Sequence, residues 1–159
     1  MARRLRGLVT ATAVLVVGAC GAPSFEEVVP VLSRPQAEQD RLPTLEDGTS
    51  IEVVDADSTR YLGSTRTAEH WVGLDGNEIC LVQFLSRAQV VGSSCATVEE
   101  FTQTGLRVST GAPGVSATGL LVPEGFDLAD AAQDEDWVSV GDNLAAPAGE
   151  VEPEASPGR

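Results

Sequence analysis

Few side chains in this sequence could do nucleophilic, acid–base or metal chemistry. The 159 residues include one histidine, His70, and three cysteines, Cys20, Cys80 and Cys95. Fourteen residues separate Cys80 from Cys95, unlike the C-x-x-C of redox and zinc sites, and no second pair of ligands accompanies them. In an exported chain, for which the amino terminus gives evidence, such a pair forms a disulfide. We therefore predict a structural Cys80–Cys95 disulfide, no metal site and no cofactor.

A predicted sheet brings the two cysteines together. Branched and apolar residues at 68–74 and 78–85 flank Asp75-Gly76, a dipeptide suited to a tight hairpin turn. A two-residue loop gives two cross-strand pairs, Trp71 with Cys80 and His70 with Leu81. A second reversal at Arg87-Ala88 places Cys80 directly opposite Cys95. Both alternating sets of residues in 79–85 are largely apolar, which predicts a central strand covered on both faces.

His70 is the only candidate general base by residue type. It shares a strand face with apolar residues, so we expect a hydrogen-bonded or rim histidine rather than a catalytic one. The serine and threonine hydroxyls lie outside any G-x-S-x-G nucleophile elbow. Tyr61, His70, Trp71 and Trp137 form the candidate binding surface. The alternative is that the aromatic residues belong to the core.

Two acidic groups have a superficial likeness to functional motifs. Residues 51–59 resemble the first motif of haloacid-dehalogenase-type phosphotransferases, an apolar strand followed by D-x-D-x-T. Those enzymes need a downstream lysine and alternating strand–helix units, and this chain has no lysine and no such alternation. We therefore expect Asp55 and Asp57 in a polar turn. A second cluster matches no calcium loop and is expected to be solvated: Asp127, Asp130, Asp134, Glu135 and Asp136.

The amino terminus has the features of a lipoprotein export signal. Three arginines within residues 1–6 precede an apolar run at 7–17, which is shorter than the ~20 residues of a spanning helix. The run ends in Val17-Gly18-Ala19-Cys20, which matches the bacterial lipobox, where the cysteine thiol receives a diacylglyceryl group and the chain is cut before it. Two acyl chains bind a bilayer stably.

We therefore expect residues 1–19 to be a signal peptide and Cys20 the lipidation site. The protein would then be anchored on the extracytoplasmic face of the cell membrane. Two alternatives are an ordinary cleavage near an unmodified Cys20 and twin-arginine export through Arg3-Arg4, whose surrounding pattern is absent.

The net charge limits the classes of binding partner that the protein can have. Aspartate and glutamate number 24 against 10 arginines, for a formal net charge of −14, and no basic patch interrupts the acidic excess. Nucleic acid is therefore excluded as a partner. Removal of residues 1–19 would leave a charge of −17, which anionic lipid head groups repel. We expect the domain to stand away from the membrane on its tether.

One domain is expected at this length. Residues 20–33 are predicted as a tether, 34–144 as the folded domain and 145–159 as a disordered tail. Helices are expected from Ser33 to Pro43, in a turn at 57–62 and, by a capping box, at 97–104. Further strands are expected at 51–54, 106–109, 115–122, 126–130 and 137–140, with a turn at 123–125.

Several short motifs resemble those of small exported lipoproteins of actinobacteria. Besides the lipobox, they are Arg34-Pro35-Gln36, Asp40-Arg41-Leu42-Pro43, Ile79-Cys80-Leu81-Val82, Ser94-Cys95-Ala96 and Leu121-Val122-Pro123-Glu124-Gly125. The resemblance spans most of residues 34–128 and implies no activity.

The expected fold is α+β, with an antiparallel sheet of about five strands, one or two short helices and one disulfide. The expected function is a non-catalytic binding or accessory lipoprotein of the cell envelope, whose partner is an envelope protein or ligand. The alternatives are an envelope hydrolase with an unrecognised site and an inhibitor or sensor module for a membrane partner. A deep cleft with polar groups around His70 would favour the hydrolase, whereas a shallow apolar patch would favour binding.

Overall fold

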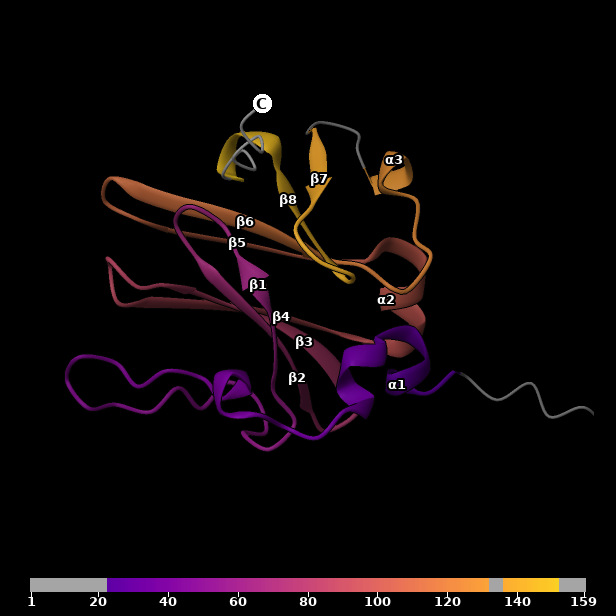
Figure 1. Cartoon of the computed structure of the whole chain (residues 1–159), viewed down its shortest axis with the longest axis horizontal. Helices are drawn as coiled ribbons and strands as arrows, with labels where there is room; N and C mark the ends of the chain where they lie inside the picture. The colour runs from indigo at the N-terminus through magenta and orange to yellow at the C-terminus, as the bar shows by residue number, and fades with distance from the viewer. Residues whose placement is uncertain (1–22, 132–135, 152–159) are drawn as a thin grey trace, which may run out of the picture.

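The computed structural model describes residues 23–131 and 136–151 as two antiparallel sheets packed face to face (Figure 1). Each sheet has four strands, in the orders β1-β2-β3-β4 and β5-β6-β8-β7. The strands of the first sheet are β1 (Arg60–Ser64), β2 (Glu69–Asp75), β3 (Glu78–Leu85) and β4 (Val90–Thr97). Those of the second are β5 (Leu106–Ala112), β6 (Val115–Leu121), β7 (Trp137–Ser139) and β8 (Leu144–Pro147).

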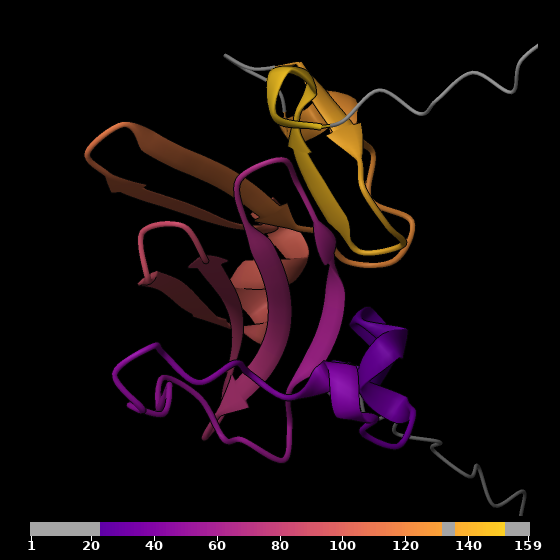
Figure 2. The ribbon, with the colours of Figure 1, turned by 60° about the vertical axis from the view of Figure 1, so that its left-hand side comes forward.

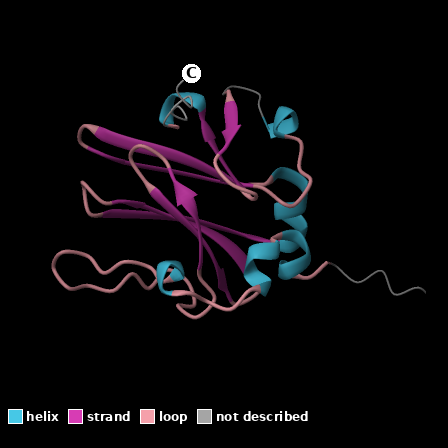
Figure 3. Cartoon of the chain, in the orientation of Figure 1, coloured by secondary structure: helices cyan, strands magenta, loops and turns pink. Residues whose placement is uncertain are grey.

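The helices are short and lie at the margins of the sheets (Figure 3). They are α1 (Phe25–Val28), α2 (Val98–Thr104), α3 (Leu128–Ala131) and the 3-10 helices η1 (Pro30–Ser33), η2 (Glu38–Asp40) and η3 (Ala148–Glu150). The fold is therefore mostly β. The expected single sheet of about five strands is replaced by two sheets of four.

The second sheet forms because α2 redirects the chain after β4. The predicted capping box is present, since the Thr97 side chain accepts from the backbone N–H of Glu100 and Glu100 bonds back to Thr97. Gly105 ends the helix at φ 68°, a conformation that favours glycine. The fully buried Phe101 fills the space between the sheets at this end.

The cross-strand position of the two cysteines is confirmed. Cys80 pairs with Cys95 across β3 and β4, and the disulfide joins them with Cα atoms 4.0 Å apart. The predicted register of the β2–β3 hairpin was wrong by two residues, because the loop is Gly76-Asn77 and Gly76 takes φ 57°. Trp71 therefore lies opposite Val82 and His70 opposite Gln83. A shift of two leaves every side chain on its predicted face.

β3 is central and covered on both faces, as its doubly apolar sequence predicts. Every residue from Ile79 to Leu85 is buried. One face of β3 packs against β5 and β6 of the second sheet. Apolar residues of the 41–58 segment cover the other face, where they contact Trp71, Val82 and Phe84.

The fold extends beyond 34–144 at both ends. α1 begins with a capping box between Ser24 and Glu27, and the buried Val28 and Val29 attach this segment to the core, so the expected tether is much shorter. Residues 144–147, partly assigned to the tail, form the buried strand β8. Figure 2 shows β7 and β8, in yellow, beside the β1–β2 hairpin. The prediction missed this strand because Ala145-Ala146-Pro147 lacks the large apolar residues typical of a buried strand, whereas small side chains are sufficient for packing here.

Four local predictions also differ from the structure. Residues 126–130 contribute to α3 instead of a strand, because the Asp127 side chain accepts from the backbone N–H of Ala129. The helix expected to begin at Ser33 is replaced by η1 and η2. Residues 51–54 lie in an irregular segment, and 57–62 pass through a turn into β1.

Candidate functional site

His70 lies between the two sheets in a polar layer formed with Gln83 and Thr110. All three side chains are buried, and Gly92 and Gly119 complete the layer from β4 and β6. A Cβ atom on Gly119 would lie 2.8 Å from the His70 ring, and one on Gly92 would clash with Thr110 Oγ1. Glycine therefore allows the sheets to close over these polar side chains.

The hydrogen bonding of the polar layer is incomplete. Gln83 Nε2 lies 2.9 Å from His70 Nε2 and donates to it. His70 Nδ1, Gln83 Oε1 and Thr110 Oγ1 are buried without a hydrogen bond of good geometry in the described chain. Burial of polar groups that are incompletely hydrogen-bonded is less favourable than burial of apolar side chains. The layer therefore contributes less to the packing between the sheets than apolar side chains would.

Burial lowers the pKa of His70 from 6.5 to about 4, because the charged ring would lose its hydration. The backbone carbonyl of Gly63, which lies opposite His70 in the sheet, acts in the other direction but is outweighed. The ring is therefore neutral near pH 7. With no exposed surface, His70 has no access to a substrate in this conformation.

The four residues of the predicted binding surface do not meet. Tyr61 and Trp71 pack edge to face, with ring centroids 5.3 Å apart, but Trp71 is buried beneath the 41–58 segment. His70 lies on the opposite face of the same sheet. Trp137 belongs to the second sheet, where the Arg107 guanidinium lies 5.5 Å from its ring centroid. The aromatic residues therefore contribute to two separate packed clusters.

A second buried ionisable group, Asp40, is fully partnered. Arg34 binds both of its carboxylate oxygens, at 2.5 and 2.6 Å, and the backbone N–H groups of Ala37 and Tyr61 donate to the same oxygens. Burial alone would raise the pKa of Asp40, but these donors outweigh it and lower the pKa to about 2. Two of the motif positions, Arg34 and Asp40, thus fasten the amino-terminal segment to β1.

The acidic groups have structural roles where the structure describes them. The Asp55 side chain accepts from the backbone N–H of Asp57, as expected for a polar turn. In the second cluster, Asp134, Glu135 and the side chain of Asp130 lie outside the described residues. Within the described part of the chain, no group of three His, Cys, Asp or Glu side chains could hold a metal ion.

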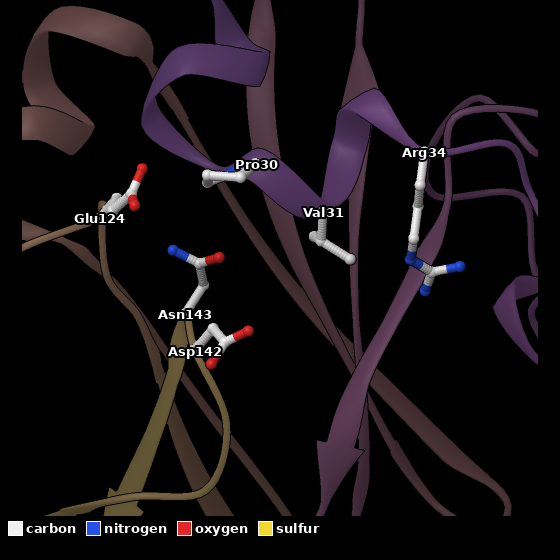
Figure 4. A pocket seen from close by; sticks show the side chains of 6 residues that line it. All are labelled: Pro30, Val31, Arg34, Glu124, Asp142 and Asn143. Atoms are coloured by element: carbon white, nitrogen blue, oxygen red, sulfur yellow. The ribbon is translucent and has the colours of Figure 1, made fainter.

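Figure 4 shows one of the surface clefts of the described residues, the η1 cleft, which has a volume of about 520 Å³. Glu124, Asp142 and Asn143 lie on one side, and the Arg34 guanidinium lies at the other end, beyond Pro30 and Val31. Asn143 donates to the backbone carbonyl of Val122, and Arg34 is bound to Asp40. The polar groups of this cleft therefore mainly hold the fold together.

Another cleft, the turn cleft, lies between the β3–β4 and β5–β6 turns and has a volume of about 570 Å³. Its walls are small or apolar, and Arg87 is its one charged residue. They comprise Thr67, Ala88, Val90, Ala112, Pro113, Gly114 and Val115. Arg87 forms no hydrogen bond or ion pair within residues 23–131 and 136–151. An apolar cleft with an unpaired guanidinium suits a ligand with an apolar group and an anionic end.

Comparisons with known proteins add no relative, since no family model, no curated protein and no solved structure matches the chain. No helix of the described residues is both long and apolar enough to span a membrane. Sequence reasoning missed Arg87 as a site residue. The sequence feature that could have indicated Arg87 is a positive charge beside a predicted turn in a strongly acidic chain.

Proposed function

We propose that this protein is a lipid-anchored, extracytoplasmic binding module of the bacterial cell envelope. The observation that supports it most directly is the Cys80–Cys95 disulfide, because structural disulfides persist in oxidising compartments outside the cytoplasm. The lipobox ending at Cys20 supplies the anchor, and the resemblance to exported actinobacterial lipoproteins agrees with it.

The short connection between lipid and fold would orient the molecule. The fold begins with the Ser24 capping box, four residues after Cys20. Four extended residues span about 14 Å at most, so the α1 end would lie close to the bilayer. Figure 1 shows α1 at one end of the molecule and the β3–β4 and β5–β6 turns at the other. The turn cleft would face away from the membrane.

Binding is favoured over hydrolysis by the position of the chemical groups. The sole histidine is buried between the sheets, whereas the turn cleft offers apolar walls and one unpaired guanidinium. A ligand can be held there by burial and charge without a nucleophile or general base.

The anchor is tested by detergent phase partitioning of the envelope protein. Wild-type protein should enter the detergent phase and Cys20→Ser the aqueous phase, because only the former would have acyl chains. The Cys80→Ala/Cys95→Ala double variant is the matched control and should remain in the detergent phase. Wild type and Cys20→Ser both in the aqueous phase would refute the anchor. Mass spectrometry should find a diacylglyceryl group on Cys20.

A further inference from the structure

Among the described edge strands, β4 differs from the other three because its outer edge has none of their protecting features. Asp40 accepts from the Tyr61 N–H and so covers β1, β7 has three residues, and β5 bears the charged Arg107. β4 has eight residues, Val90–Thr97, with no charge and no proline. Natural proteins blunt such edges because they template the pairing of another chain.

The disulfide identifies which backbone groups of β4 face outward. A Cα separation of 4.0 Å is typical of directly opposed residues whose own N–H and C=O groups point away from the partner strand. Cys95 is such a residue, and so, at alternate positions, are Ser93 and Val91. Among the described residues, no group hydrogen-bonds these outward N–H and C=O groups. These backbone groups are therefore free to form hydrogen bonds with an added strand.

The turn cleft adjoins the first residue of this edge. Val90 belongs to both β4 and the cleft wall, and Arg87 lies three residues earlier in the turn. The Gln89 side chain fixes that turn, because its Nε2 donates to Ser86 O at 2.7 Å and its Oε1 accepts from the Glu46 N–H at 2.8 Å. Arg87 therefore lies, exposed, in a turn that these two hydrogen bonds support.

We propose that β4 and the turn cleft bind the extended carboxyl terminus of a partner polypeptide. A strand added antiparallel to β4 would run from the α2 end towards Val90, so its last residue would reach the cleft and its α-carboxylate would reach Arg87. Main-chain hydrogen bonds supply affinity in this mode, and pockets supply specificity. The inference rests on the proposed function, since it names the partner of the same binding module.

The test measures retention of peptides by the full-length mature chain in detergent micelles. The probe is a pool of hexapeptides, random at five positions, that ends in valine with a free carboxylate; the comparison pool is the same with a C-terminal amide. The acid pool should be retained at least tenfold more than the amide pool. Arg87→Gln should remove this difference, whereas Arg41→Gln, which removes the same charge beside another cleft, should preserve it.

A second pair of variants tests the strand edge. Ser93→Pro removes one outward N–H and should lower retention of both pools about tenfold, whereas Ser93→Ala keeps the N–H and should have no effect. Equal retention of acid and amide pools, no retention of either, or equal effects of the two arginine variants would overturn the proposal. Retention that depends on Arg87 but not on Ser93→Pro would indicate a small-carboxylate site and contradict strand addition.

Self-association is the remaining outcome. A wild-type dimer in sedimentation that Ser93→Pro abolishes would mean that a second copy covers β4, and would overturn the partner assigned here. The Cys20→Ser chain should retain peptides like wild type. Failure of the peptide test therefore leaves the anchor test unaffected, and failure of the anchor leaves peptide binding measurable.

Discussion

The two ends of the sandwich differ in how they are packed. At the end with α1, α2 and the disulfide, large side chains fill the space between the sheets, among them Phe101, Ile79, Leu81 and Leu121. At the end with the β3–β4 and β5–β6 turns, the apolar cluster between the sheets consists of Ala68, Ala117 and a single leucine, Leu85. The polar layer of His70, Gln83 and Thr110 separates the two.

The two ends of the fold therefore contribute differently to its stability. Between the sheets, the large buried apolar side chains, and with them most of the stabilisation from that interface, lie at the disulfide end. The turn end buries smaller side chains, leaves polar atoms unsatisfied and keeps an open cleft. A protein that binds at one end can tolerate weak packing there when the other end holds the fold.

The largest expected effect comes from emptying the disulfide end. Phe101→Ala should lower the free energy of unfolding by about 4 kcal/mol, because it removes a fully buried ring and leaves a cavity. Val115→Ala at the turn end should cost only about 1 kcal/mol, since Val115 is half-exposed. Urea unfolding of both variants measures the contrast. Equal losses would mean that the two ends contribute alike.

Removal of the disulfide should have the next largest effect. The Cys80→Ala/Cys95→Ala double variant should lose about 3 kcal/mol, because opening the loop frees the unfolded chain. The melting temperature should fall, with little effect on peptide retention. Free thiol at both cysteines in protein from the envelope would show that the bond is absent from the native molecule.

Acidification should weaken the polar layer. The pKa of His70 is about 4 in the fold and 6.5 in the unfolded chain, so the unfolded chain binds more protons between these values. Stability is therefore full above pH 6.5 and falls as pH drops towards 4, by about 2 kcal/mol at pH 5. His70→Gln does not titrate and should remove this slope. The Asp40 carboxyl affects stability in a separate pH range. Its pKa is lowered from 3.8 to about 2, so the stabilisation that it contributes is lost only as the pH falls from about 3.8 towards 2.

Local signals in the sequence predicted the elements with strong short-range patterns. The Thr97–Glu100 capping box, the doubly apolar β3 and the opposed cysteines are all present as predicted. Each depends on neighbours within one hairpin or one helical turn. The hairpin register failed by two residues because both Asp75-Gly76 and Gly76-Asn77 are chemically suitable loops.

The features that sequence reasoning missed depend on contacts between distant segments. β8 pairs with β6 and β7 through small residues that have no strand pattern of their own. The burial of His70 depends on Gly119, 49 positions later, which lets the second sheet close over the ring. The turn cleft joins residues of three separate hairpins. Contacts between distant segments produce no periodic pattern in a single sequence, so they could not be predicted from it.

The most direct test of a lipid-anchored module that binds away from the membrane is its orientation on vesicles. A fluorophore is attached to Glu26→Cys in α1 or to Pro113→Cys in the β5–β6 turn, both at exposed positions, and the vesicles contain nitroxide-labelled head groups. If the α1 end lies next to the bilayer, quenching should be strong at position 26 and almost absent at position 113. Equal quenching at both positions, or stronger quenching at position 113, would contradict this orientation.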